Sequence, residues 1–120
     1  MKLSGVMLNS ENPNELAKFY TKILGKPGWQ EEEWYGYGDR GSNLLIGPHS
    51  DVKGKNTAPA RLMLSFAVED VAKEFNLVIS AGGKVIAEPH QPDKENTPKA
   101  WLATLEDPDG NYLQLATPWE

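Results

Sequence analysis

One polar residue in the last apolar run of the chain is a candidate to contact a ligand or a metal ion. Residues 106–115 read EDPDGNYLQL, in which a turn of the D-P-D-G type precedes an alternating strand. Gln114 stands between Leu113 and Leu115, so its side chain faces the side of the strand opposite to theirs. Two interpretations stay open. The amide faces a binding cleft and contacts a ligand or metal ion, or it satisfies a neighbouring polar group.

Histidines are the other candidates for proton transfer. His49 and His90 are the only two, and each lies in a polar segment with prolines. Either could act as a general acid or base, but a solvated loop histidine has the same sequence signature. The chain has no cysteine, which excludes disulfides, thiolate metal sites and a cysteine nucleophile. Neither a nucleophile elbow nor a phosphate-binding loop occurs in the sequence.

Aromatic residues are numerous for a chain of 120 residues. Aromatic walls with a few polar groups are typical of clefts that bind flat organic molecules. The alternative is that about half of these side chains belong to the core or to a subunit interface. The residues concerned are Trp29, Trp34, Tyr35, Tyr37, Trp101, Tyr112 and Trp119.

Charge and composition argue against several classes of partner. The formal net charge is −5 at pH 7 and the basic residues are scattered, which disfavours nucleic acid and anionic membrane surfaces. No stretch reaches the length of a transmembrane helix, and polar residues interrupt the N-terminal segment where a signal peptide would be apolar. We therefore expect a cytoplasmic protein.

The first half of the chain predicts a strand, a helix and further strands. An alternating segment over residues 3–9 is typical of a strand. Asn12 is a typical helix cap, and Gly25 is a typical helix end. Short strands separated by glycine turns follow within residues 28–47. Residues 48–60 are polar, rich in proline and glycine, and indicate a linker.

The second half repeats this order. A strand over residues 61–68 is followed by a helix that Asp70 can cap, and by three strands within residues 84–117. We therefore predict an α+β fold of two tandem βαβββ modules, residues 1–58 and 59–120.

Two segments resemble the vicinal oxygen chelate superfamily. They are ELAKFYTKILG, residues 15–25, and DPDGNYLQL, residues 107–115, and both occur at the expected places of the repeated module. This superfamily includes glyoxalase I, extradiol dioxygenases and the fosfomycin- and bleomycin-resistance proteins. The resemblance covers nearly the whole chain. It implies mixed sheets that curl around a cleft, with the helices on the outer face.

The resemblance also implies where a metal ion would be held. The ligand positions of the superfamily correspond to Gly5, Leu45, Met63 and Gln114 in this chain. Glycine and leucine offer no side-chain donor, methionine offers a soft thioether, and one neutral amide cannot hold a divalent cation alone. We therefore expect no metal cofactor, with a bound divalent metal as the alternative.

A metal-free binding protein similar to bleomycin-resistance proteins is the first functional hypothesis. It would bind or sequester a small organic molecule, and we expect binding rather than catalysis. The alternatives are a metal-dependent enzyme of the glyoxalase or dioxygenase kind and a ligand-free regulatory or dimerisation module. Small members of the superfamily pair their modules, so we expect a homodimer. The expected cleft residues are Tyr35, Tyr37, Met63, Trp101, Tyr112 and Gln114.

Overall fold

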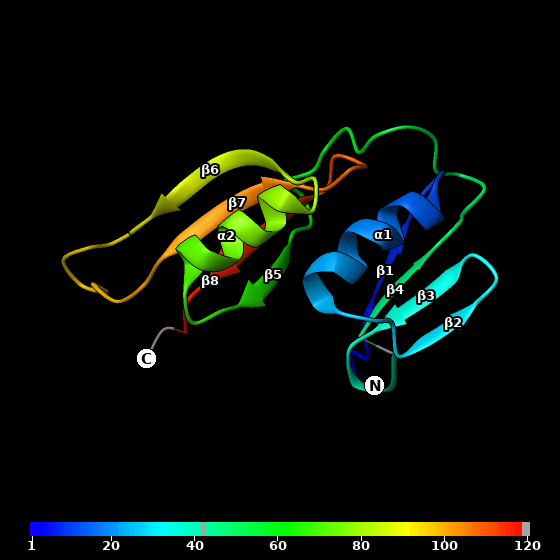
Figure 1. Cartoon of the computed structure of the whole chain (residues 1–120), viewed down its shortest axis with the longest axis horizontal. Coiled ribbons are helices and arrows are strands. Elements are labelled where there is room, and N and C mark those ends of the chain that lie inside the picture. Colours follow the sequence, from blue (N-terminus) through cyan, green and yellow to red (C-terminus); the bar gives the residue numbers. More distant parts are fainter. Residues whose placement is uncertain (42, 119–120) are drawn as a thin grey trace. The chain divides into compact units, whose positions relative to one another are not determined.

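A computed structural model describes residues 1–41 and 43–118 (Figure 1). The chain forms two compact units, Met1–Lys55 and Asn56–Glu120. Each unit has the order strand, helix, three strands, which confirms the predicted α+β fold with a repeated βαβββ plan. Trp119 of the aromatic set lies outside the described residues. Neither α-helix in the described part of the chain is long and apolar enough to span a bilayer.

The first unit is a four-stranded mixed sheet with one helix, α1 (Pro13–Leu24), packed on one face. The parallel pair β1 and β4 lies at one side of the sheet, and the antiparallel strands β3 and β2 follow. A 3-10 turn, Asp39–Gly41, connects β3 to β4. In spatial order the strands are β1 (Val6–Asn9), β4 (Leu44–Gly47), β3 (Trp34–Tyr37) and β2 (Trp29–Glu31).

Helix α1 begins differently from the capping prediction. Asn12 occupies the N-cap position, but its side chain makes no capping hydrogen bond. The backbone N–H of Asn12 instead donates to Ser10 Oγ at 2.9 Å, and Ser10 is fully buried. Pro13 suits the first helical position because its missing N–H would have no partner there. Gly25 ends the helix as predicted, with φ at +92° and its N–H donating to Thr21 O.

The second unit repeats the mixed sheet and places α2 (Val71–Ser80) on one face. Asp70 caps α2 as predicted, because its carboxylate accepts a hydrogen bond from Lys73 N at 3.1 Å. Strands β5 and β8 are parallel, and the other two pairs are antiparallel. In spatial order the strands are β5 (Leu64–Ala67), β8 (Tyr112–Ala116), β7 (Leu102–Glu106) and β6 (Lys84–His90).

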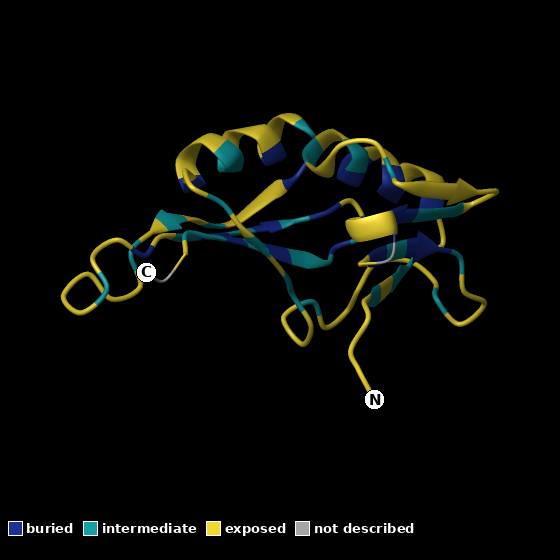
Figure 2. Ribbon diagram, turned by 90° about the horizontal axis from the view of Figure 1, so that it is seen from below, coloured by how far each residue is buried: buried dark blue, intermediate teal, exposed yellow. Residues whose placement is uncertain are grey.

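In each unit the core lies between the helix and the sheet, where the buried residues face one another (Figure 2). Period-two alternation produces this layer, since every second strand residue points towards the helix. The other face of each sheet carries no helix of its own unit in the described residues. The core residues are Leu16, Phe19, Tyr20, Leu44 and Ile46 in the first unit, and Val71, Val78, Ala103, Leu105, Leu113 and Leu115 in the second.

Two glycines of the first unit allow close approaches on the sheet face opposite to α1. A β-carbon on Gly36 would overlap the carbonyl oxygen of Gly41, because the 3-10 turn passes directly over that strand position. A β-carbon on Gly47 would overlap the six-membered ring of Trp34, which lies on the Gly47 backbone. The chain itself therefore fills much of this face of the first unit.

A buried carboxylate organises the turn between β7 and β8. Asp107 is 2% exposed, and its Oδ1 accepts hydrogen bonds from Asp109 N at 2.9 Å and Asn111 N at 3.0 Å. The Asn111 amide donates to Asp107 Oδ2 at 2.9 Å and accepts from Asn56 Nδ2, also at 2.9 Å. The turn thus fixes the start of β8 and ties the segment around Asn56 to it.

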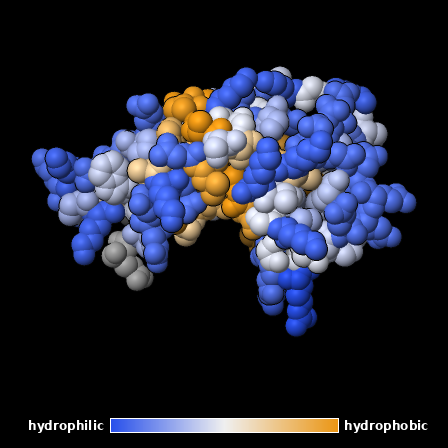
Figure 3. All heavy atoms as spheres, in the orientation of Figure 1, coloured by the Kyte–Doolittle hydropathy of each residue, from blue (hydrophilic) through white to orange (hydrophobic). Residues whose placement is uncertain are grey.

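Figure 3 shows apolar surface on the second unit, and exposed apolar side chains occur on both β6 and helix α2. Leu77 and Ile79 on α2 and Val85 and Ile86 on β6 are 37–46% exposed. Strand β6 is the outermost strand of its sheet, and its pairing with β7 shifts register on either side of Ala87.

Candidate functional site

A row of polar side chains crosses the uncovered face of the second sheet. Gln114 in β8 pairs with Ser65 in β5 on one side and with Thr104 in β7 on the other. Paired residues in adjacent strands project from the same face, so these three side chains lie in one row. Leu113 and Leu115 are buried on the opposite face towards α2.

The amide of Gln114 makes no hydrogen bond within residues 1–41 and 43–118. The interpretation that it satisfies a neighbouring polar group therefore has no support in the structure. A glutamine amide offers one acceptor oxygen and two N–H donors, and the serine and threonine hydroxyls add a donor and an acceptor each. The row carries no formal charge, so it suits a neutral carbonyl, amide or hydroxyl group.

Tyr112 and Met63 extend this face towards one end of the sheet. Tyr112 lies two residues from Gln114 in β8 and pairs with Glu106. Met63 directly precedes β5 and falls on the Ser65 side by alternation. A shallow hollow of about 480 Å³ adjoins Tyr112 and is lined on its other sides by residues 58–61. The structure thus places three of the six predicted residues, Met63, Tyr112 and Gln114, on one face.

Tyr35 and Tyr37 lie on the helix-covered face of the first sheet, contrary to the prediction. They pair with Ile46 and Leu44, which are buried under α1. The Tyr35 hydroxyl donates to Asn14 Oδ1 at 2.7 Å, and the Tyr37 hydroxyl donates to Ala17 O at 3.0 Å. Both acceptors belong to α1. These hydroxyls fasten the helix to the sheet and leave the tyrosines no role on the uncovered face.

Burial raises the pKa of the Tyr37 phenol, although the hydrogen bond with Thr21 Oγ1 at 2.8 Å lowers it in part. The neutral phenol is therefore the form that the fold stabilises. A folded pKa above the unfolded value of about 10 means that this stabilisation is complete below about pH 10. It is lost as the pH rises through the raised pKa of the folded state.

Replacing Tyr37 with phenylalanine should cost about 1 kcal/mol of unfolding free energy at neutral pH, because a buried hydroxyl hydrogen bond is lost. The difference in unfolding free energy between the wild type and the variant should shrink above about pH 10, because the wild-type phenol ionises there when the chain unfolds. Urea unfolding at neutral pH and above that pH tests this. Tyr35→Phe is the matched control, since its hydrogen bond is exposed. An unchanged difference at both pH values would contradict the expectation.

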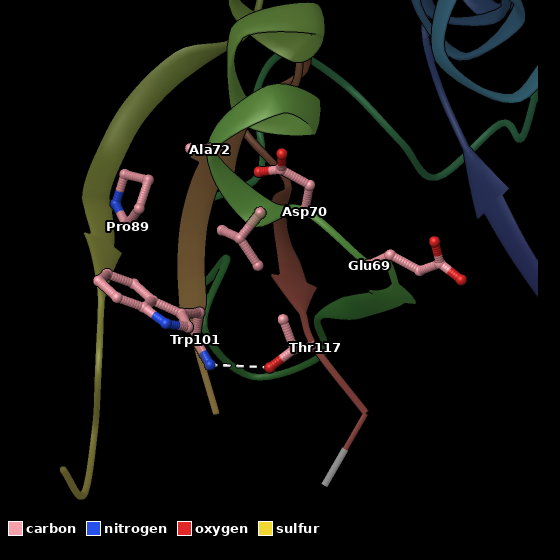
Figure 4. A pocket seen from close by; sticks show the side chains of 7 residues that line it. Glu69, Asp70, Ala72, Pro89, Trp101 and Thr117 are labelled. Carbon is pink, nitrogen blue, oxygen red and sulfur yellow. Dashed lines mark hydrogen bonds between the residues drawn. The ribbon is translucent and has the colours of Figure 1, made fainter. Parts of the chain in front are cut away.

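Trp101 lies on the helix side of the second sheet and does not share a face with Gln114, again contrary to the prediction. It precedes Ala103 by two residues, and Ala103 is buried towards α2. Trp101 instead lines a hollow of about 320 Å³ at the start of α2, together with Pro89 and Thr117 (Figure 4). Its backbone N–H donates to Thr117 Oγ1 at 2.8 Å.

The sequence model of the glyoxalase-like domain matches residues 5–116 of the chain. The chain belongs to this family. No curated protein matches it. Solved structures from the glyoxalase, bleomycin-resistance and dioxygenase superfamily share its fold, which confirms the resemblance seen in the sequence.

Three of these structures illustrate the likeness of fold. A glyoxalase-related enzyme from Fulvimarina pelagi has a TM-score of 0.76 at 18% identity, over 98% of this chain and 88% of that chain. A glyoxalase/bleomycin resistance protein from Albidiferax ferrireducens T118 has a TM-score of 0.72 at 24% identity, over 97% of this chain and 98% of that chain. The fosfomycin resistance protein FosX from Listeria monocytogenes has a TM-score of 0.70 at 12% identity, over 98% of this chain and 93% of that chain.

The four residues that the resemblance assigns to metal-ligand positions lie in or directly before strands of the two sheets. Leu45 pairs with Met7 in the first sheet, and Gln114 pairs with Ser65 in the second. Gly5 and Met63 directly precede β1 and β5. These residues supply no imidazole and no carboxylate, the groups that bind divalent metals in proteins. Within the described ranges, no group of three or more His, Cys, Asp or Glu could hold a metal ion.

Both histidines of the glyoxalase-like domain make local hydrogen bonds, His49 in the segment after β4 and His90 at the end of β6. His49 Nδ1 accepts from Asp51 N at 3.0 Å, and His90 Nδ1 lies 2.8 Å from Glu88 O. Both are exposed. His49 therefore fits the interpretation as a loop histidine, whereas His90 is the last residue of strand β6.

Sequence reasoning missed Ser65 and Thr104 as neighbours of Gln114. The alternation in RLMLSFAV already placed Ser65 on the face opposite to Leu64 and Phe66. Thr104 could be found only from the register of β7 against β8, which the sequence does not state.

Proposed function

We propose that this glyoxalase-like domain binds a small organic molecule on the uncovered face of its second sheet, without a metal ion. The observation that carries the proposal is the row of Ser65, Gln114 and Thr104, in which the central amide makes no hydrogen bond within the described chain. The lack of metal donors at the superfamily positions supports recognition by hydrogen bonds rather than coordination.

The ligand should be polar and only partly aromatic. Of the four aromatic residues first expected in the cleft, Tyr112 alone lies on this face, since Tyr35, Tyr37 and Trp101 pack towards the helices. One aromatic side chain beside an uncharged polar row favours a compound with a carbonyl, amide or hydroxyl group next to a small ring.

A thermal-shift screen of small carbonyl, amide and hydroxyl compounds tests the proposal in the presence of EDTA. A ligand at about 100 times its Kd should raise the unfolding free energy by about 2.7 kcal/mol through mass action. Gln114→Leu should weaken a hit about tenfold, or about 1.4 kcal/mol, because the ligand loses its amide partner. Gln30→Leu is the matched control, since Gln30 is an exposed strand glutamine of the first unit.

Three outcomes would overturn the proposal. Equal loss of affinity in the Gln114→Leu and Gln30→Leu variants would place the ligand elsewhere. Binding that EDTA abolishes and Zn²⁺, Ni²⁺, Mn²⁺ or Fe²⁺ restores would favour the metal-dependent enzyme instead. The absence of any hit in a broad screen would favour the ligand-free module.

A further inference from the structure

The hollow beside Trp101 lies on the side of the second sheet opposite to Gln114. Its volume of about 320 Å³ falls at the lower end of ligand pockets. Every residue that lines it belongs to the second unit. It is formed where the start of α2 meets β6 and the ends of β7 and β8 (Figure 4).

The walls of this hollow are mostly apolar. Trp101 is 39% exposed although it is a large aromatic residue, and Pro89 stands beside its ring (Figure 4). Val71 and Ala72, from the first turn of α2, provide the aliphatic wall. An indole ring that faces an open hollow is the strongest aromatic partner for a cation, because its face carries negative electrostatic potential.

The rim of the hollow is acidic. Glu69 and Asp70 line it, and no residue that lines it in the described chain is basic. Neither carboxylate forms an ion pair within residues 1–41 and 43–118. The dipole of α2 places about half a positive elementary charge at the N-terminus of the helix. This charge is smaller in magnitude than the two negative charges of Glu69 and Asp70. Figure 4 shows the Glu69 carboxylate pointing away from Trp101, so it acts at the rim.

Two acceptors that line the hollow already have hydrogen-bond donors within the second unit. Thr117 Oγ1 donates its single proton to Lys99 O at 3.1 Å and accepts from Trp101 N at 2.8 Å. Asp70 Oδ1 accepts from Lys73 N at 3.1 Å. A primary ammonium needs three acceptors. Asp70 Oδ2 and the Glu69 carboxylate are the lining carboxylate oxygens without a hydrogen-bond partner in the described chain, and the Glu69 carboxylate points away from Trp101 (Figure 4). A methylated ammonium has few or no N–H groups and gains from the indole face instead.

We infer that this hollow binds a small organic cation with a methylated ammonium group. Trp101 supplies the aromatic face, Val71 and Pro89 enclose the methyl groups, and Asp70 and Glu69 supply the compensating charge. The site is separate from the one at Gln114, and neither depends on the other.

Choline and its uncharged isostere 3,3-dimethyl-1-butanol test the site by ¹H–¹⁵N NMR titration of the full chain. The indole N–H signal of Trp101 and the amides of Val71 and Ala72 should shift. Choline should bind about tenfold more tightly than the isostere, because only the cation interacts with the ring face and the carboxylates. Trp101→Leu should lose about tenfold in choline affinity. Asp70→Asn should weaken binding about threefold, and it keeps the helix cap because asparagine caps as well as aspartate.

Trp29→Leu is the matched control, since Trp29 is 42% exposed and belongs to the first unit. Choline affinity should be unchanged in Trp29→Leu and in Gln114→Leu. Equal affinity for choline and its isostere in the wild-type chain would overturn the inference, whether or not the variants fold. Shifts confined to the β8 amides around Gln114 would also overturn it, while leaving the proposed function intact.

Discussion

Asp107→Ala should lower the free energy of unfolding by about 3 kcal/mol, because a buried carboxylate with several hydrogen-bond donors is removed. Asp109 N, Asn111 N and the Asn111 amide would all lose their acceptor. Water can replace it only in part, since Asp107 is 2% exposed. The start of β8 would lose its anchor, so ligand binding at Gln114 should weaken as well. Urea unfolding at neutral pH measures the loss.

Two variants of the same turn sharpen this test. Asp107→Asn keeps one acceptor oxygen and should cost less than alanine at the same position. Asp109→Ala is the matched control, because the Asp109 side chain makes no hydrogen bond within the described chain and only its backbone serves the turn. It should change stability by less than about 0.5 kcal/mol. Equal costs for Asp107→Ala and Asp109→Ala would refute the role of the buried carboxylate.

Gly36→Ala should also cost about 3 kcal/mol or more, through overpacking rather than backbone strain. The φ angle of Gly36 is not positive, so alanine can adopt the local conformation. The added β-carbon would overlap the Gly41 carbonyl oxygen, which belongs to the 3-10 turn and cannot move like a side-chain end. Denaturant midpoints of the wild type and the variant give the cost.

Gly47 provides the comparison, because its close neighbour is a side chain. The added β-carbon in Gly47→Ala would overlap the Trp34 ring. Removing that ring by substitution would relieve the overlap. The cost of Gly47→Ala should therefore fall in a Trp34→Ala background, with a coupling energy of about 1 kcal/mol or more. If Gly36→Ala proved no more costly than an exposed strand substitution, the close approach of the 3-10 turn would be wrong.

Local patterns in the sequence were sufficient for the order of elements and for the orientation of Gln114. Period-two alternation placed Gln114 opposite to Leu113 and Leu115, and the buried leucines confirm that orientation. The cap at Asp70 was also local, since the acceptor and its donor at Lys73 lie within one turn. At α1 the same reasoning was wrong, because the Asn12 side chain accepts no hydrogen bond from the first helical turn although Asn12 occupies the N-cap position.

Errors in the predicted site come from non-local register. Tyr35 and Tyr37 alternate with Trp34 and Gly36, and either set could face the helix on pattern alone. The pairing of Tyr35 with Ile46 decides the matter, and no local signal encodes that pairing. Tyrosine also suits both environments, because its ring packs in a core while its hydroxyl reaches a polar partner at the edge.

Strand β6 is an edge strand that carries exposed apolar side chains. An unpaired strand at the margin of a sheet can template a strand from another molecule and start an intermolecular sheet. The exposed apolar side chains of Val85 and Ile86 favour such association at this edge strand. The pairing of β6 with β7, however, shifts register on both sides of Ala87, and Pro89 has no backbone N–H to donate. A straight incoming strand would therefore meet an uneven row of donors and acceptors, and we expect this irregularity to oppose the growth of an intermolecular sheet.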